Sequence, residues 1–241
     1  MFNEEAGASR CVRSVCAVLD TMPHRCTLVV VDDGSRDGTR AILRALESEH
    51  AQLSVVWNEH NRGYGAALQS GVCAAAKLDV EYALFMDSDL TNAPADIPRF
   101  AALMETGVDV IKATRYSRGG RVDGVPTHRI FISAVGNRLA KMLMRMPLHD
   151  CTNGFRAVRL ALLTRMTLRE PRFPIIMEEL YWCRALGATF AEIPVTLVNR
   201  SPDQRPTMFA YKPQMFWRYL KYPLRAFFGQ VPDRGSAADA P

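Results

Sequence analysis

The sequence has no run of about 18 apolar residues, the length that lets a helix cross a bilayer, and no signal-peptide pattern. We therefore expect no membrane-spanning helix in these 241 residues. The six cysteines are scattered, mostly in apolar context, and form no Cys-x-x-Cys pair. Buried thiols in a reducing compartment are thus favoured over a disulfide framework or a zinc site.

Three other patterns are missing. The sequence has no Gly-x-Gly-x-x-Gly fingerprint, so a nicotinamide or flavin cofactor is not expected. It has no internal repeat. No recognised nucleic-acid-binding motif accompanies its basic residues, so nucleic acid is not an expected partner either.

The net charge of +5 hides an asymmetry along the chain. Residues 1–111 hold 9 Lys and Arg against 16 Asp and Glu, whereas residues 112–241 hold 21 against 9. An acidic half suits a metal, and a basic half suits phosphates, nucleic acid or an anionic membrane surface. The length and the 48% hydrophobic content fit one α/β core, alone or with a small appendage.

Apolar runs alternate with segments of helical period. We expect strands at 27–31, 53–57, 82–86 and 108–113, and helices at 4–20 (capped by Asn3), 39–48 and 65–77. The second half predicts helices at 130–146 and 177–186 and a strand at 190–198. This alternation favours a parallel sheet with helices on both faces, which binds ligands at the carboxyl ends of its strands. The loops of interest are therefore 32–38, 58–65 and 87–94.

Asp87-Ser88-Asp89 follows the apolar run 82–86. Residues two apart in a strand point to the same side, so both carboxylates can face one crevice. Magnesium or manganese would relieve their repulsion, because both ions prefer hard oxygen ligands. Solvated turn acids are the alternative.

Two more motifs follow predicted strands. Asp32-Asp33-Gly34-Ser35 is an Asx-type turn or a place where a carboxylate accepts hydrogen bonds from a nucleobase or ribose. In Asn61-Arg62-Gly63-Tyr64-Gly65, the glycines allow close backbone approach, and the helix that follows presents its positive end to a phosphate.

Three arginines lie at strand or loop ends: Arg115, Arg129 and Arg200. Singly, each is typical of a protein surface. Together, opposite an Asp-x-Asp, they indicate a phosphate clamp, because the guanidinium fork matches phosphate oxygens.

Residues 209–228 hold eight of the 21 aromatic residues, several basic residues and no acid. They form either an interfacial anchor on a membrane surface or a segment that packs back onto the core. The tail 230–241, rich in Pro, Gly, Ala and Asp, is expected to be disordered. The predicted organisation is a domain at 1–207, a basic aromatic helix at 208–229 and this tail.

Seven motifs occur in a fixed order between residues 2 and 200: Asn3-Glu4-Glu5, Val31-Asp32-Asp33-Gly34-Ser35, Asn61-x-Gly63-x-Gly65-Ala66-Ala67, Asp87-Ser88-Asp89-Leu90, Arg115-Tyr116-x-x-Gly119-Gly120, Asn153-Gly154-Phe155-Arg156 and Glu192-Ile193-Pro194-Val195. This set resembles the family 2 glycosyltransferases, and most of all the dolichyl- and polyprenyl-phosphate sugar transferases.

The resemblance implies a GT-A fold, with a mostly parallel, Rossmann-like sheet flanked by helices. It also implies a GDP- or UDP-sugar donor, Mg²⁺ or Mn²⁺, and a polyprenyl or dolichyl phosphate acceptor. Such an enzyme would work on the cytoplasmic face of the membrane as a peripheral protein, with a membrane partner protein in some cases.

Residue roles also follow from the resemblance. Asp33 would contact the base, with Asn3, Glu4, Asp32, Gly63, Gly65 and Glu178 as further donor-binding positions. Asp87 and Asp89 would serve the metal and the diphosphate, with Thr91 beside the metal. Arg115 and Arg129 would hold the diphosphate and the acceptor phosphate, and Arg200 would close the site.

The chain departs from the family in three ways. Relatives place an apolar strand directly before Asn-Glu-Glu, where this chain has only Met1-Phe2; we expect a truncated or mis-started chain with neighbouring ladders unpaired. The Arg-x-x-Gly-x-Ser-Lys motif is replaced by Arg200-Ser-Pro-Asp-Gln-Arg-Pro. The two membrane helices of some bacterial relatives are absent. A soluble glycan or small-molecule acceptor, or a catalytically silent nucleotide-sugar-binding protein, therefore stays open as an alternative.

The chemistry implied is an inverting transfer, in which an acceptor phosphate oxygen attacks the anomeric carbon. A phosphate monoester has a second pKa near 6, so this nucleophile is already anionic at neutral pH. No dedicated base is needed, and none of the five histidines lies in a motif.

Overall fold

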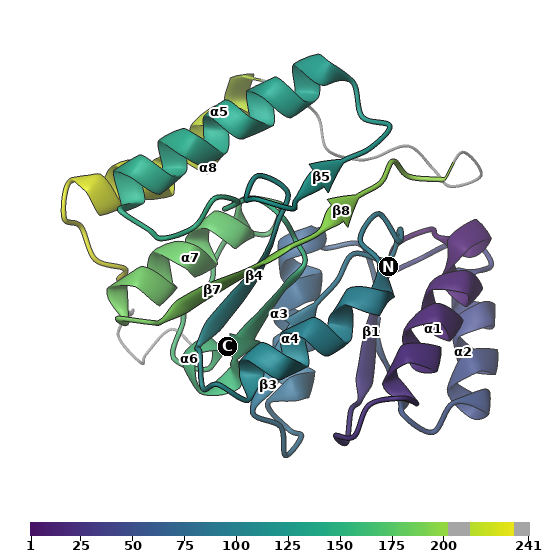
Figure 1. Cartoon of the computed structure of the whole chain (residues 1–241). Coiled ribbons are helices and arrows are strands. Elements are labelled where there is room, and N and C mark those ends of the chain that lie inside the picture. The colour runs from purple at the N-terminus through teal and green to yellow at the C-terminus, as the bar shows by residue number, and fades with distance from the viewer. Residues whose placement is uncertain (202–212, 234–241) are drawn as a thin grey trace.

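The computed structural model describes residues 1–201 and 213–233 (Figure 1). The first half contains α1 (Glu5–Leu19), β1 (Leu28–Asp33), α2 (Thr39–Glu49), β2 (Leu53–Asn58), α3 (Tyr64–Ala75), β3 (Tyr82–Phe85), the short 3₁₀ helix η1 (Pro94–Asp96), α4 (Ile97–Met104) and β4 (Val110–Thr114). The second half contains β5 (Arg121–Val122), α5 (Thr127–Met144), β6 (Arg156–Arg159), α6 (Leu160–Leu163), α7 (Ile175–Ala185), β7 (Phe190–Pro194), β8 (Thr196–Leu197) and α8 (Pro213–Phe227).

Within the described residues the strands form three hydrogen-bonded sheets, with helices on both sides, and the smallest is the parallel pair of β5 and β8. β1 and β2 pair in parallel, and the four remaining long strands follow the order β3-β6-β4-β7. β4 and β7 are parallel, whereas β6 runs antiparallel to both of its neighbours. The predicted α/β class is confirmed, but the antiparallel strand β6 was not predicted. Its four residues include two arginines, so it lacks the apolar run that marked the other strands.

β1 and β3 belong to different hydrogen-bonded sheets. Met1 lies along β1: its ammonium group donates to the carbonyl of Val31, and its carbonyl accepts from the amide of Asp33. The residues 28–31 and 84–86, on the two facing strand edges, line one cavity. The space between these strands is therefore continuous with the site described below.

The predicted helix cap at Asn3 is wrong, because α1 begins at Glu5 and Asn3 binds the loop after β1 instead. The Asn3 side chain accepts from the backbone amide of Arg36, and the backbone amide of Asn3 donates to Ser35 Oγ at 2.9 Å. The amide of Glu4 donates to Thr39 Oγ1 at 2.8 Å. The Asn-Glu-Glu motif thus ties the amino end of α1 to the amino end of α2.

α5, α7 and α8 form a second layer over the sheet (Figure 1). Met144 of α5, Leu180 of α7, and Tyr222 and Ala226 of α8 pack into one core cluster. Trp217, also on α8, is 68% exposed. The aromatic segment 209–228 therefore packs on the core with one side and faces outward with the other, within its described part 213–228. The expected disorder of the tail stays a prediction, because residues 234–241 lie outside the described chain.

A buried ion pair lies beneath the carboxyl ends of the strands. Arg156 of β6 is fully buried and donates to both carboxylate oxygens of Glu179 on α7, at 2.5 and 2.7 Å. It also donates to the carbonyl of Gly154 and lies over the ring of Phe85, 4.3 Å from its centroid. All three guanidinium nitrogens of Arg156 thus donate hydrogen bonds within the core.

Removing one partner of this pair should destabilise the fold strongly. We expect Glu179→Gln to lower the free energy of unfolding by about 3–5 kcal/mol, because it leaves a buried guanidinium without its counterion. The double variant Arg156→Met/Glu179→Leu should recover most of that loss. Urea unfolding followed by circular dichroism measures both. Glu49→Gln, which breaks the half-exposed pair with Arg13, is the control and should change stability little.

Candidate active site

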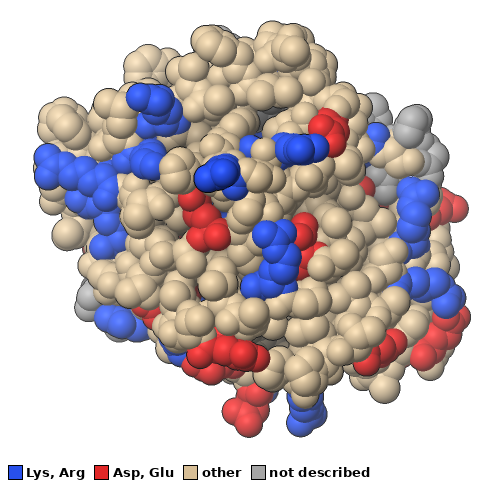
Figure 2. Space-filling model, in the orientation of Figure 1, with Lys and Arg blue, Asp and Glu red and all other residues tan. Residues whose placement is uncertain are grey.

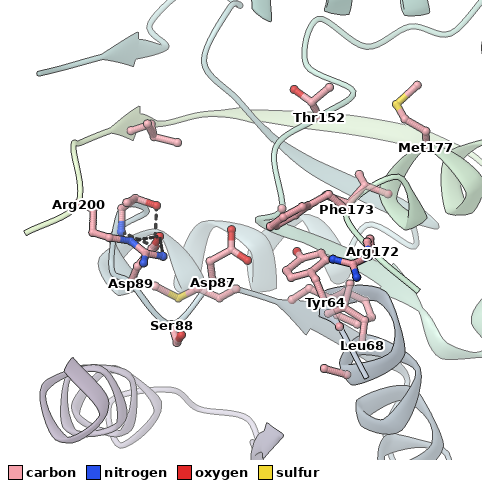
Figure 3. Close-up of a pocket in the computed structure, with 18 of the residues that line it drawn as sticks. Tyr64, Leu68, Asp87, Ser88, Asp89, Thr152, Arg172, Phe173, Met177 and Arg200 are labelled. Atoms are coloured by element: carbon pink, nitrogen blue, oxygen red, sulfur yellow. Dashed lines mark hydrogen bonds and ion pairs between the residues drawn. The ribbon is translucent and has the colours of Figure 1, made fainter. Parts of the chain in front are cut away.

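A cavity of about 800 Å³ opens where β1, β3 and β4 end (Figure 3). Its floor is acidic, with Glu4, Asp33, Asp87 and Asp89. Arginines line it as well: Arg115, Arg129, Arg172 and Arg200. The opposite wall comes from α5 and α8 and is largely apolar, with Ile132, Leu139, Ala140, Met215, Phe216, Tyr219, Leu220 and Pro223.

Asp87 lies just beyond the end of β3, between the Asp89 side and the aromatic side of the cavity (Figure 3). The ring of Phe173 stacks on Tyr64, with 4.9 Å between centroids, and the Tyr64 hydroxyl bonds the Asp87 carboxylate. A side chain at Gly154 would come within 2.8 Å of Asp87 Oδ2, so only glycine leaves room for this carboxylate. Burial, and then the charge of Asp89, raise the pKa of Asp87.

Asp89 is held on both of its oxygens. Its Oδ1 accepts from the amide and the hydroxyl of Thr91, and its Oδ2 accepts from Arg200 Nη2 at 2.8 Å (Figure 3). The other terminal nitrogen of Arg200 lies 3.8 Å from Glu4. Arg200 therefore joins two other predicted site residues, Asp89 and Glu4, and its cationic group supplies positive charge at this end of the Asp-x-Asp motif.

The two aspartates fit a cation that is shared with a substrate, but not an all-protein metal site. No cluster of three or more His, Cys, Asp or Glu side chains suited to a metal occurs within residues 1–201 and 213–233. Mg²⁺ commonly takes one or two carboxylates and completes its shell with water and substrate phosphates. Burial and then the charge of Asp89 outweigh the nearby Arg156 and Arg200 and raise the pKa of Asp87, so the charged form of this carboxylate is disfavoured.

Asp33 reaches from the end of β1 to the next loop. Its carboxylate accepts from the amides of Arg62 and Gly63 and from the side chain of Asn58. Gly63 has φ of +96°, a backbone conformation that glycine adopts readily and other residues do not. This pairing fixes the loop before α3 against β1 and leaves Asp33 and Gly63 on the cavity lining.

The amino end of α3 binds protein rather than presenting open amides. The carbonyl of Pro171 accepts from the amide of Gly65 at 2.9 Å, and a side chain at Gly65 would meet the carbonyl of Glu170. The sequence predicted that Gly65 leaves room for a phosphate. In the structure, the main chain at Glu170 and Pro171 occupies that space instead. The close approach is made by the loop at 170–172, to which α8 is also attached: Lys221 and the Tyr222 hydroxyl both bond Glu170.

Arg115 lines the cavity, but Asp150 holds its guanidinium group. Arg115 Nε and Nη2 donate to the two oxygens of Asp150, at 2.6 and 2.9 Å, and Nη2 also donates to Thr152. Asp150 is fully buried, and Arg115 helps to lower its pKa against the effect of burial. Glu192 in turn accepts from the amide of Asp150, so a chain of contacts sets the angle at which Arg115 meets the cavity.

Nine of the predicted site residues line this cavity: Glu4, Asp33, Gly63, Asp87, Asp89, Thr91, Arg115, Arg129 and Arg200. Four others belong to its support, because their polar groups are bonded within the protein. Asp32 is buried and paired with Arg40, and Asn3 binds the loop at 35–36. Glu178 accepts from the amides of Arg169 and Glu170, and Gly65 packs as described above.

Several residues at the site were not predicted from the sequence. Tyr64 stood inside a quoted motif without a role, and Phe173 and Arg172 lie in a segment with no recognisable pattern. Glu179 and Asp150 were missed because their partners are 23 and 35 residues away along the chain. Charged residues within otherwise apolar helices, as Glu179 is in α7, are the one signal that could have indicated buried pairs.

An acidic floor at the carboxyl ends of α/β strands, facing arginines across one cavity, defines a site for a substrate that carries phosphate groups. The chain belongs to glycosyl transferase family 2, whose sequence model matches residues 1–166. It is therefore a glycosyltransferase.

Two relatives show the level of sequence similarity. Polyprenol monophosphomannose synthase of Mycolicibacterium smegmatis is 29% identical over 191 residues, covering 76% of this chain and 72% of its own. Undecaprenyl-phosphate mannosyltransferase of Micrococcus luteus is 27% identical over 184 residues and covers 75% of each.

The fold matches solved glycosyltransferases. Glucosyl-3-phosphoglycerate synthase from Mycobacterium tuberculosis, in complex with Mn²⁺, uridine diphosphate and glucosyl-3-phosphoglycerate, superposes with a TM-score of 0.65. The match is 22% identical and covers 97% of this chain and 78% of the other. The expected GT-A fold is thereby confirmed. As for membrane spans, within the described ranges none of the helices is both apolar enough and long enough to traverse a bilayer.

The raised pKa of Asp87 predicts that the stability of the folded protein depends on pH. Because its pKa is raised, the folded state holds the proton more tightly than the unfolded state, so stability falls as the pH rises above about 4. We expect Asp87→Asn to melt at a higher temperature than the wild type at neutral pH, with the difference shrinking toward acidic pH.

Thermal unfolding from acidic to neutral pH measures this difference. Asp79→Asn, at an exposed aspartate after α3, is the matched control and should show none. An Asp87→Asn variant that is less stable than the wild type at neutral pH would show that the carboxylate is well compensated, contrary to this prediction.

Proposed function

We propose that the protein transfers a sugar, with inversion, from a nucleotide-sugar to a polyprenyl phosphate. One observation carries the proposal: a single cavity joins an Asp-x-Asp floor and its arginines to an apolar wall made by α5 and α8. The floor suits a diphosphate and the wall suits an isoprenoid. The names of the two sequence relatives, a polyprenol monophosphomannose synthase and an undecaprenyl-phosphate mannosyltransferase, support the same acceptor class.

Asp33 and Gly63 would receive the nucleoside, and Asp87, Asp89 and Thr91 would hold a divalent cation together with the donor diphosphate. When bound, such a cation lowers the energy of the negative charge that builds up on the leaving diphosphate. The structural neighbour's complex with Mn²⁺ and uridine diphosphate supports this arrangement, without fixing the base that this chain selects. Arg200 reaches the same carboxylate of Asp89 and so supplies positive charge at the same place.

Arg129, at the amino end of α5, would hold the acceptor phosphate. It lines the cavity where the acidic floor meets the apolar wall, so the lipid behind this phosphate would lie between α5 and α8. An oxygen of the phosphate monoester attacks the anomeric carbon while the bond from that carbon to the donor diphosphate breaks. The nucleoside diphosphate leaves with the electron pair, and the product is a sugar phosphodiester.

This step requires no general base, because the attacking phosphate is already anionic at neutral pH. All five histidines lie in the described part of the chain, and none of them lines the cavity. Arg115, oriented by Asp150, would stabilise the charge of the departing diphosphate.

A phosphorylated small molecule is the second candidate acceptor. The structural neighbour is a glucosyl-3-phosphoglycerate synthase whose match covers 97% of this chain, and the phosphoglyceric acid bound in another of its complexes carries a phosphate group that the cavity arginines would bind. In either case, the protein would act at the cytoplasmic side. With a lipid acceptor it would act as a peripheral membrane protein. The membrane partner protein expected from the sequence has no support in the relatives' names and stays a prediction.

The proposal is tested by measuring transfer from a panel of GDP- and UDP-sugars with Mn²⁺ present. The acceptors are a short-chain polyprenyl phosphate, 3-phosphoglycerate and an uncharged soluble glycan. Turnover with the polyprenyl phosphate alone is the expected result. Turnover only with 3-phosphoglycerate would replace the first candidate by the second. Donor hydrolysis that no acceptor changes would contradict both.

Asp89→Asn should lower the transfer rate by about a hundred- to a thousand-fold at saturating donor, the usual effect of removing one group that stabilises a leaving anion. It should also weaken binding of Mn²⁺ in the presence of uridine diphosphate, measured by calorimetry. Asp96→Asn, in the short helix η1 that follows the loop of Asp89 and paired with Arg99, is the control. Undiminished turnover by folded Asp89→Asn would remove Asp89 from the site.

A further inference from the structure

α5 exposes a row of large apolar side chains. Phe131 is 70% exposed, Val135 50%, Leu139 42% and Met142 63%. Steps of four, four and three residues place these side chains on one side of the helix. The opposite side, with Asn137, Ala140 and Met144, is buried in the protein. An amphipathic helix whose apolar residues point outward needs a partner other than the core of its own chain.

α8 lies beside α5 and extends this surface (Figure 1). Its buried side holds Tyr222 and Ala226, whereas Trp217 is 68% exposed. Tryptophan favours the headgroup region of a bilayer because it presents both an apolar ring and a hydrogen-bond donor. We call the exposed side chains of Phe131, Val135, Leu139, Met142 and Trp217 the α5–α8 face.

The charge around this face has one sign. Neither α5 nor α8 contains an acidic residue. Their basic residues are Arg129, Arg138 and Lys141 on α5, and Arg218, Lys221 and Arg225 on α8. Figure 2 shows the surface over α5 as tan and blue, with most of the acidic residues in the lower part of the view. An apolar row whose own two helices carry basic and no acidic residues is complementary to anionic lipid headgroups.

The face is also continuous with the cavity. Leu139 is exposed and at the same time lines the cavity wall, whereas Phe131 and Met142 lie outside that lining. A molecule held in a lipid layer against α5 would therefore meet the cavity from its apolar side. Its polar end would arrive at Arg129 and the acidic floor.

We propose that the α5–α8 face docks the enzyme on an anionic bilayer. The inference extends the membrane contact expected of residues 209–228 to α5, which supplies four of the five side chains of the α5–α8 face. It rests on the proposed function in one respect only, that the lipid acceptor enters the cavity between α5 and α8. Docking itself is a property of the surface and can be measured without turnover.

The test is co-sedimentation of the full chain with vesicles of phosphatidylcholine, alone or mixed with phosphatidylglycerol. The wild type should bind the anionic vesicles preferentially. Phe131→Ser/Met142→Ser should lower its partition coefficient at least tenfold, because each change removes a large apolar side chain from the lipid. Arg138→Glu/Arg218→Glu should lower binding to the anionic vesicles by a similar factor and leave binding to neutral vesicles unchanged.

Two control variants make equal changes elsewhere. Leu78→Ser alters an exposed leucine after α3, and Arg165→Glu reverses an exposed charge after α6. Both should bind anionic vesicles like the wild type. A wild type that stays in solution with anionic vesicles, or a Phe131→Ser/Met142→Ser variant that binds as well as the wild type, would overturn the proposal.

A separate assay keeps this inference apart from the proposed function. With a short-chain polyprenyl phosphate dissolved in the absence of vesicles, the Phe131→Ser/Met142→Ser variant should turn over like the wild type. A loss of turnover there would show that the substitutions act on the cavity, and it would overturn the docking assignment. Absence of turnover by the wild type with every donor would refute the proposed function and leave the vesicle result standing.

Discussion

The site depends on the repulsion between two carboxylates held at the end of one strand. Asp87 and Asp89 face the same cavity, and burial together with the charge of Asp89 raises the pKa of Asp87. Nearby positive charge reduces the repulsion between the two carboxylates. Arg200 supplies part of it by binding Asp89, and a cation with a bound diphosphate would supply more. Carboxylates whose charge is unfavourable in the folded state are a common feature of active sites, where binding is favoured at the expense of stability.

Beneath the carboxylates lies a layer of fully buried charge that holds them in place. Arg156 pairs with Glu179, and Lys112 donates to the carbonyl of Asn153, with its pKa lowered to about 8 mainly by burial. Asp150 holds Arg115 from the same layer. Buried pairs of this kind add little net stability, but they leave few alternative arrangements for the groups above them. The orientation of Arg115 is therefore set from this layer, by residues that do not line the cavity.

The parts of the fold that could be predicted are those encoded locally. The runs 27–31, 53–57 and 82–86 identified three strands within two residues of their bounds, and the acids that follow two of these strands reached the cavity as expected. Interactions between distant segments could not be predicted. β6 forms by pairing with β3 and β4, which lie earlier in the chain, and Gly65 is covered by a loop more than 100 residues away along the chain. Asn3 and Asp32 matched the family pattern, yet both serve loop packing, which sequence motifs cannot distinguish from ligand contact.

The attachment of the loop at 170–172 couples two parts of the molecule with different tasks. Lys221 and Tyr222 of α8 bond Glu170, and the neighbouring carbonyl of Pro171 bonds the first turn of α3, where Tyr64 meets Asp87. A shift of α8 would move the main chain at 170–172. This movement would in turn displace the ring of Tyr64, whose hydroxyl meets Asp87. The position of α8 is thus coupled to the position of Asp87. How firmly α8 packs on the core would influence how precisely the donor is held.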